Sequence, residues 1–77
     1  MVYPEALREA ILKALPGAQV EVEDTTGTRD HFSATVVAPQ FQGKSRIEQH
    51  KMVYAALGDL MAGAVHALAL KTSVPPT

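Results

Sequence analysis

Three histidines are the residues of this chain with the clearest capacity for chemistry, since the sequence contains no cysteine. A neutral imidazole is a good ligand for zinc, copper or iron. His66 begins the apolar segment HALAL, His31 begins the alternating segment HFSATVVA, and His50 lies in a long helix-forming segment. A lone histidine is more often a hydrogen-bonded structural residue than a ligand. A metal site therefore requires a fold that brings two of these histidines together.

Enzymatic catalysis is not expected from the remaining residues. No serine or threonine has the context of a nucleophile elbow, and no glycine-rich phosphate loop is present. The acidic residues at 21–24 cluster on what we expect to be the outer face of a strand, and a chain of 77 residues has little room for a closed active site. We predict a protein that is not an enzyme.

Hydrophobic periodicity predicts the elements that position the histidines. After Pro4, leucine and isoleucine recur at helical spacing until Pro16 and Gly17 interrupt the pattern. Two segments that begin at Ala18 and His31 then alternate apolar and polar side chains, which is typical of strands with one solvent-exposed face. The turn formers TTGTRD join them, so we expect a hairpin.

The main helix is predicted to begin at about Arg46, because Ser45 and Glu48 have the spacing of a capping box. Phe41 is expected to anchor the turn that precedes it. The helix carries a broad set of apolar residues, as expected of a helix that packs across a sheet: Ile47, Val53, Tyr54, Leu57, Leu60 and Met61.

Two glycines are expected to shape the second half of the chain. Gly58 should divide the helical segment into two pieces and Gly63 should end the second piece. The residues from His66 to Thr72 then form a third strand, and the polar, proline-containing residues 73–77 are expected to be a flexible tail.

This order of elements predicts an α+β fold with a geometric consequence for the histidines. A strand that is joined through helices to another strand of the same sheet normally returns parallel to it, by a right-handed crossover. His31 and His66, which begin the second and third strands, should then share one edge of the sheet, about 5 Å apart if the strands are neighbours. Topology thus predicts a two-histidine corner beside the loop TTGTRD.

The charge distribution leaves nucleic-acid binding open as an alternative. Residues 1–38 hold three basic and six acidic side chains, a balance of −3, whereas residues 39–77 hold four basic and two acidic side chains, a balance of +2. Lys44, Arg46 and Lys51 surround the start of the main helix, where backbone N–H groups could hold phosphate. Three basic residues at a helix start are more often simply solvated.

The expected compartment is reducing and aqueous. The chain has no cysteine, its first residues carry charges where a signal peptide needs an apolar run, and no segment approaches the roughly 18 apolar residues of a membrane span. We expect a cytoplasmic protein, or one of an organellar matrix in a eukaryote, with no membrane contact.

Several motifs resemble the BolA family from the first helix to Thr72, which we take as the domain, 1–72. They are EVEDTT at 21–26, HF at 31–32, FQGKSRIEQHKMVYAAL at 41–57 and VHALALKT at 65–72. The last two are the most specific, because they combine the turn of Phe41 and Gly43, the helix histidine His50 and the His-Ala-Leu strand start.

The resemblance implies a fold of order αββααβ, related to type II KH domains, with a three-stranded mixed sheet covered by helices. That order agrees with the one read from periodicity. KH domains that bind RNA use a Gly-x-x-Gly loop between helices, and Gly58 and Gly63 have the wrong spacing for that loop. The departure argues against RNA binding of the KH type.

The resemblance also implies a function as a partner of monothiol glutaredoxins. Such a heterodimer shares a 2Fe–2S cluster, with the partner's cysteine and glutathione on one iron, and it acts in iron-sulfur trafficking or iron sensing. His66 matches the principal ligand of the family. Thr28 and Arg29 occupy the loop where many members have a second ligand, so His31 is the remaining candidate.

The resemblance implies, for the isolated chain, a monomer or weak homodimer that binds no cofactor tightly. Its alternative implication is a DNA-binding regulator of transcription, of the kind linked to stress responses, which would use Lys44, Arg46 and Lys51. Weak DNA binding is the expectation under that alternative.

Overall fold

The computed structural model describes residues 3–25, 27, 31–61 and 67–76, and it has the predicted α+β architecture. The elements follow in the order α1 (Pro4–Ala14), β1 (Gln19–Asp24), β2 (His31–Val37), a short 3-10 helix (Pro39–Phe41), α2 (Arg46–Leu57) and β3 (Ala67–Ser73). The predicted start of the main helix at Arg46 is confirmed.

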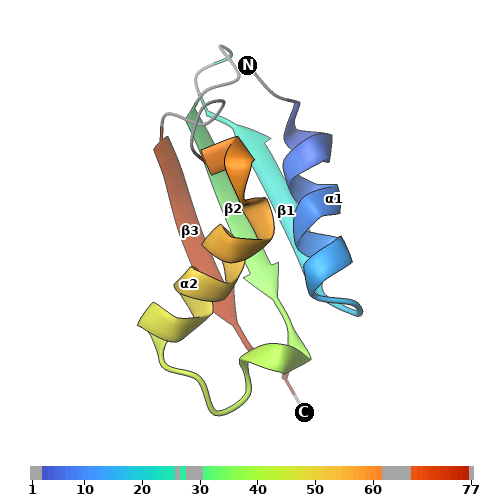
Figure 1. Cartoon of the computed structure of the whole chain (residues 1–77), viewed down its shortest axis with the longest axis vertical. Helices are drawn as coiled ribbons and strands as arrows, with labels where there is room; N and C mark the ends of the chain where they lie inside the picture. The colour runs from blue at the N-terminus through green and yellow to red at the C-terminus, as the bar shows by residue number, and fades with distance from the viewer. Residues whose placement is uncertain (1–2, 26, 28–30, 62–66, 77) are drawn as a thin grey trace.

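The three strands form one mixed sheet in the order β1-β2-β3. β1 pairs with β2 antiparallel, and β2 pairs with β3 parallel. Both helices lie on the same face of this sheet (Figure 1), so β2 is the central strand of a two-layer domain. The parallel pairing of the second and third strands confirms the crossover that the order of elements predicts.

Turn chemistry explains how the elements begin and end. Pro4 lies in the first turn of α1, where a missing N–H costs nothing. Gly17 has a φ of 84°, a left-handed conformation that lets the chain leave α1 and enter β1. Gly43, with a φ of 76°, does the same between the 3-10 helix and α2, and the Lys44 N–H donates to the Phe41 carbonyl at 3.0 Å.

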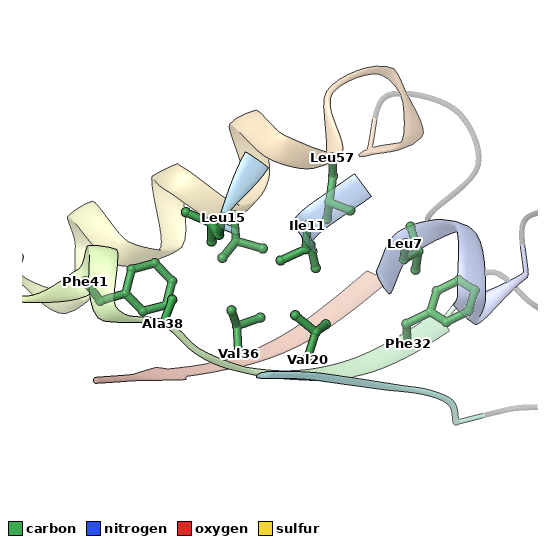
Figure 2. Close-up of a cluster of buried hydrophobic side chains, with 10 residues drawn as sticks. Leu7, Ile11, Leu15, Val20, Phe32, Val36, Ala38, Phe41 and Leu57 are labelled. Atoms are coloured by element: carbon green, nitrogen blue, oxygen red, sulfur yellow. The ribbon is translucent and has the colours of Figure 1, made fainter. Parts of the chain in front are cut away.

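The core lies between the helices and one face of the sheet (Figure 2). Alternate residues of β2, namely Phe32, Ala34 and Val36, are buried because a strand presents every second side chain to the same face. Phe41 is fully buried at one end of this core, which confirms it as the anchor of the turn. The helices and β1 complete the core with Leu7, Ile11, Leu15, Val20, Val53 and Leu57.

The prediction that a broad apolar face of α2 packs against the sheet is wrong for two residues. Ile47 is 70% exposed and Tyr54 is 40% exposed. They lie seven positions apart on one stripe of the helix, whereas Val53 and Leu57, four positions apart, form the stripe that meets the sheet. A narrow stripe suffices because α1 covers the sheet beside α2 in Figure 1.

Gly58 ends α2, as predicted, with its N–H donating to the Tyr54 carbonyl at 3.0 Å. Residues 59–61 continue in helical conformation. Gly63 and His66 lie outside the described residues. β3 begins at Ala67 and ends at Ser73, one residue beyond the predicted end. Within the described ranges, no helix has the length and apolar content of a membrane span.

The packing of the turn predicts unequal costs for two substitutions. Phe41→Ala should lower the free energy of unfolding by about 3–5 kcal/mol, because it empties a fully buried site. Ile47→Ala removes a side chain that is 70% exposed and should change the free energy by no more than about 0.5 kcal/mol. Denaturant unfolding of the two variants measures both values, and equal losses would contradict the burial described above.

Candidate functional site

The corner where β2 and β3 begin is the first candidate site. In the parallel register, His31 is the Cα partner of Ala67, the first residue of β3. Ala67 directly follows His66 in the chain, and His66 itself lies outside the described residues. The predicted convergence of the two strand starts is therefore confirmed as far as Ala67.

Local hydrogen bonds fix the backbone at His31. Its carbonyl accepts a hydrogen bond from the Thr25 N–H at 3.0 Å and a second from Thr25 Oγ1 at 3.2 Å. The Gly27 N–H donates to Asp24 Oδ1 at 2.9 Å, which closes a turn at the end of β1. These bonds tie the end of β1 to the start of β2.

The side chain of His31 is half-buried and lies on the face of the sheet away from the helices. Its neighbour Phe32 is buried beneath the helices, and successive residues of a strand point to opposite faces. The imidazole of His31 therefore lies on the face of the sheet that neither α1 nor α2 covers. Thr28 and Arg29 lie outside the described residues.

Among the described residues, no group of three or more histidine, cysteine, aspartate or glutamate side chains is placed to hold a metal ion. His50 does not join His31. It lies on α2 beside Leu70–Ser73, at the opposite end of β3 from Ala67. The fold thus separates these two histidines, and His50 is half-buried outside the core.

The start of α2 already holds a carboxylate. The Ser45 N–H donates to Glu48 Oε1 at 3.0 Å, and the Glu48 N–H donates to Ser45 Oγ at 3.2 Å. The hydrogen bond from the Ser45 N–H to the carboxylate is the largest cause that holds the pKa of Glu48 below its ordinary value of 4.5. The Ser45 side chain and the charges of Lys44 and Lys51 lower this pKa further. The capping box therefore occupies two of the N–H groups that a phosphate would need.

The structure also divides the three predicted basic residues. Lys44 and Lys51 lie close enough to Glu48 to lower its pKa, whereas Arg46 lines a hollow on another side of the helix. All three side chains are exposed. They do not form one basic face opposite a single ligand.

The hollow beside Arg46 is a second candidate site, which sequence reasoning missed. It has a volume of about 540 Å³ and lies between α2 and the second half of β3, lined by Thr35, Arg46, His50, Leu70, Lys71, Thr72 and Ser73. A signal for it exists in the sequence. Arg46, His50, Val53 and Leu57 follow the spacing i, i+4, i+7, i+11, so the stripe of α2 that is buried farther along begins with two basic or titratable residues.

Comparison with protein families identifies a match over most of the chain. The family model described as BolA-like protein matches residues 9–76. An uncharacterized protein of Rickettsia prowazekii, RP812, is 33% identical over 75 residues, which cover 96% of this chain and 97% of that protein. The DNA-binding transcriptional regulator BolA of Escherichia coli is 30% identical over 79 residues, covering 94% of this chain and 75% of the regulator.

Solved structures agree with this match. A bolA homologue from Coxiella burnetii superimposes with a TM-score of 0.82 at 36% identity, over 97% of this chain and 94% of that one. The BolA domain of SufE1 from Arabidopsis thaliana gives a TM-score of 0.84 at 31% identity, over 94% and 91% of the two chains. The chain spans only 57% of BolA-like protein 1 of Bos taurus, which is 34% identical and matches 91% of this chain.

The capping box predicts a pH-dependent contribution to stability. Ser45→Ala removes the hydroxyl that Glu48 contacts but keeps the backbone N–H at position 45, so the pKa of Glu48 should rise only part of the way toward 4.5. The loss of the N-cap side chain should cost about 1 kcal/mol at neutral pH. A carboxyl group with a lowered folded-state pKa stabilises above its ordinary value, and this stabilisation is lost as pH falls through the lowered pKa.

Carboxyl carbon NMR of Glu48 and thermal unfolding measure the two effects. The difference in melting temperature between the parent and Ser45→Ala should be full at neutral pH and should shrink below about pH 4.5. An unchanged Glu48 pKa in the variant would contradict the capping box.

Proposed function

Because the chain belongs to the BolA family, we propose that it is a non-enzymatic adaptor that pairs with a monothiol glutaredoxin and co-ligates a labile 2Fe–2S cluster in iron-sulfur trafficking or iron sensing. His66 is the proposed principal ligand and His31 the proposed second ligand. The observation that carries this proposal is the pairing of His31 with Ala67, the residue that follows His66.

The donor chemistry of the chain supports this role. It has histidine but no cysteine, so any thiolate must come from the partner and from glutathione. Imidazole in place of thiolate on one iron of a 2Fe–2S cluster raises the reduction potential. Histidine ligands must also be deprotonated to bind, so the affinity falls at low pH. These properties favour a cluster that is exchanged or sensed.

The surroundings of His31 suit a shared site. Thr25 fixes the His31 backbone through two hydrogen bonds, which limits the freedom that a ligand must lose on binding. The side chain is half-buried on the face of the sheet that neither α1 nor α2 covers, and the proposed partner would approach from that side. The fixed backbone would hold the imidazole of His31 in place, while the partner would cover the corner.

His66→Ala tests the principal ligand. The purified chain, mixed with a monothiol glutaredoxin, glutathione, iron and sulfide, should form a heterodimer with a visible-region spectrum distinct from that of the glutaredoxin homodimer. His66→Ala should abolish that distinct spectrum. Ser33→Ala, two residues from His31 on the same face of β2, is the matched control and should preserve it. An unchanged spectrum in His66→Ala would rule out ligation by His66.

DNA binding is the second candidate function, favoured by the name of the Escherichia coli relative, a DNA-binding transcriptional regulator. The basic residues Lys44, Arg46 and Lys51 would contact phosphate. The capping box weighs against this candidate, because the Glu48 carboxylate already occupies the helix start.

Salt dependence tests this second candidate. If the three basic residues contact phosphate, duplex affinity should fall steeply with added salt, with a slope in log Kd against log salt of about 3. Lys44→Gln should reduce that slope by about 1. Fluorescence anisotropy with a labelled duplex at low salt measures both, and the absence of any binding would exclude the candidate.

A further inference from the structure

We propose that the hollow between α2 and the outer edge of β3 binds an acidic, extended segment of a partner protein, which adds to β3 as a further strand. This site lies at the opposite end of β3 from the His31–Ala67 corner. It stands independently of the proposed cluster function, because no residue of the hollow takes part in that corner.

The edge of β3 is accessible to another strand. The sheet order places β3 at one side, paired with β2 alone among the described strands. Four consecutive residues, Leu70–Ser73, line the hollow. Leu70 and Thr72 face α2, whereas Lys71 and Ser73 point to the opposite face, so these residues present both faces of the edge strand. A peptide there would find unpaired backbone donors and acceptors.

The opposite edge of the sheet is protected in a way that β3 is not. Arg8 Nε donates to the Val20 carbonyl of β1 at 3.3 Å, and Glu21 and Glu23 of the same strand are exposed. A side-chain hydrogen bond to the backbone and repeated charges both discourage added strands. The one described charge on β3 is Lys71, which repels basic segments but attracts acidic ones.

The charge of the hollow selects an acidic occupant. Arg46, His50 and Lys71 line it, and no aspartate or glutamate does. Within the described part of the chain, these three side chains form no hydrogen bond or ion pair. Arg46 lines the hollow from α2, whereas the side chain of Lys71 lies on the opposite face of the strand, as does that of its partner Thr35. Each of the two can therefore pair with a carboxylate on its own face of an added strand.

The roof of the hollow is held in place by Gln49. Thr72 Oγ1 donates to Gln49 Oε1 at 2.6 Å, which ties α2 to β3, and Gln49 Nε2 donates to the Lys44 carbonyl at 3.0 Å. The helix and the strand edge are thus already spaced before a ligand arrives. Such preorganisation lowers the cost of binding.

A peptide fits this site better than single-stranded nucleic acid, which is also acidic. Proteins that hold single strands stack the bases on aromatic rings. No phenylalanine, tyrosine or tryptophan lines the hollow. The strand edge, in contrast, offers the backbone hydrogen bonds that an extended peptide requires.

The test uses the full chain and a fluorescein-labelled peptide of repeating Glu-Glu-Val-Val, which places glutamates on both faces of an added strand. Anisotropy should report saturable binding, and nitrogen-15 spectra should show shifts concentrated at Leu70–Ser73 and at His50. Arg46→Gln and Lys71→Gln should each weaken binding by about tenfold, because each removes a charged partner of a glutamate. Lys13→Gln, in the last turn of α1, is the matched control and should change Kd by less than about twofold.

Two further probes separate strand addition from charge attraction alone. A peptide with proline in place of every valine keeps the glutamates but cannot pair along a strand, and it should bind at least about tenfold more weakly. Equal binding of the proline peptide, shifts confined to other surfaces, or no binding at low salt would each overturn the proposal. Tighter binding of a short oligothymidine to the same amides would also overturn it, in favour of nucleic acid.

Discussion

The parallel pairing of β2 with β3 is the constraint on which the rest of this small domain depends. β2 is bonded on both sides, and its alternate residues Phe32, Ala34 and Val36 form the floor of the core. A parallel neighbour cannot follow through a tight turn, so the chain must cross back over the sheet. α2 is that crossover, and Val53, Leu57 and the buried turn at Phe41 fix where it crosses. The positions of both candidate sites follow from this crossing.

As a result of this crossing, the two ends of β3 have different surroundings. Its first residue pairs with His31 at an open corner, whereas its second half lies beside the first turns of α2. At about 3.3 Å per residue, Ala67 and Lys71 are roughly 13 Å apart along the strand. The proposed ligand corner and the proposed peptide site therefore lie at opposite ends of one edge strand and do not compete for space.

The positions of the basic residues show that charges close together in the sequence need not form one charged surface. Lys44, Arg46 and Lys51 are close in sequence, but the capping box places a carboxylate among them. The Glu48 carboxylate accepts a hydrogen bond at the helix start and offsets the positive charges of Lys44 and Lys51. These nearby charges in turn lower the pKa of Glu48. Arg46 lies instead beside the second half of β3, whose own charge, Lys71, is 25 positions away in the chain and lies on the opposite face of the sheet. The unbalanced positive charge therefore lies in the hollow.

The amino-acid sequence by itself determined the elements and their order, because periodicity, capping residues and turn glycines act locally. It also determined that β2 and β3 run parallel with His31 at a shared edge, since crossover handedness leaves little choice. Only the tertiary structure decided which face of α2 meets the sheet. Ile47 and Tyr54 are apolar but exposed, and Arg46 continues the buried stripe into a hollow, because the first turns of α2 reach the edge of β3. Periodicity fixes the spacing of a stripe, but the partner surface determines which stripe is buried and where that burial stops.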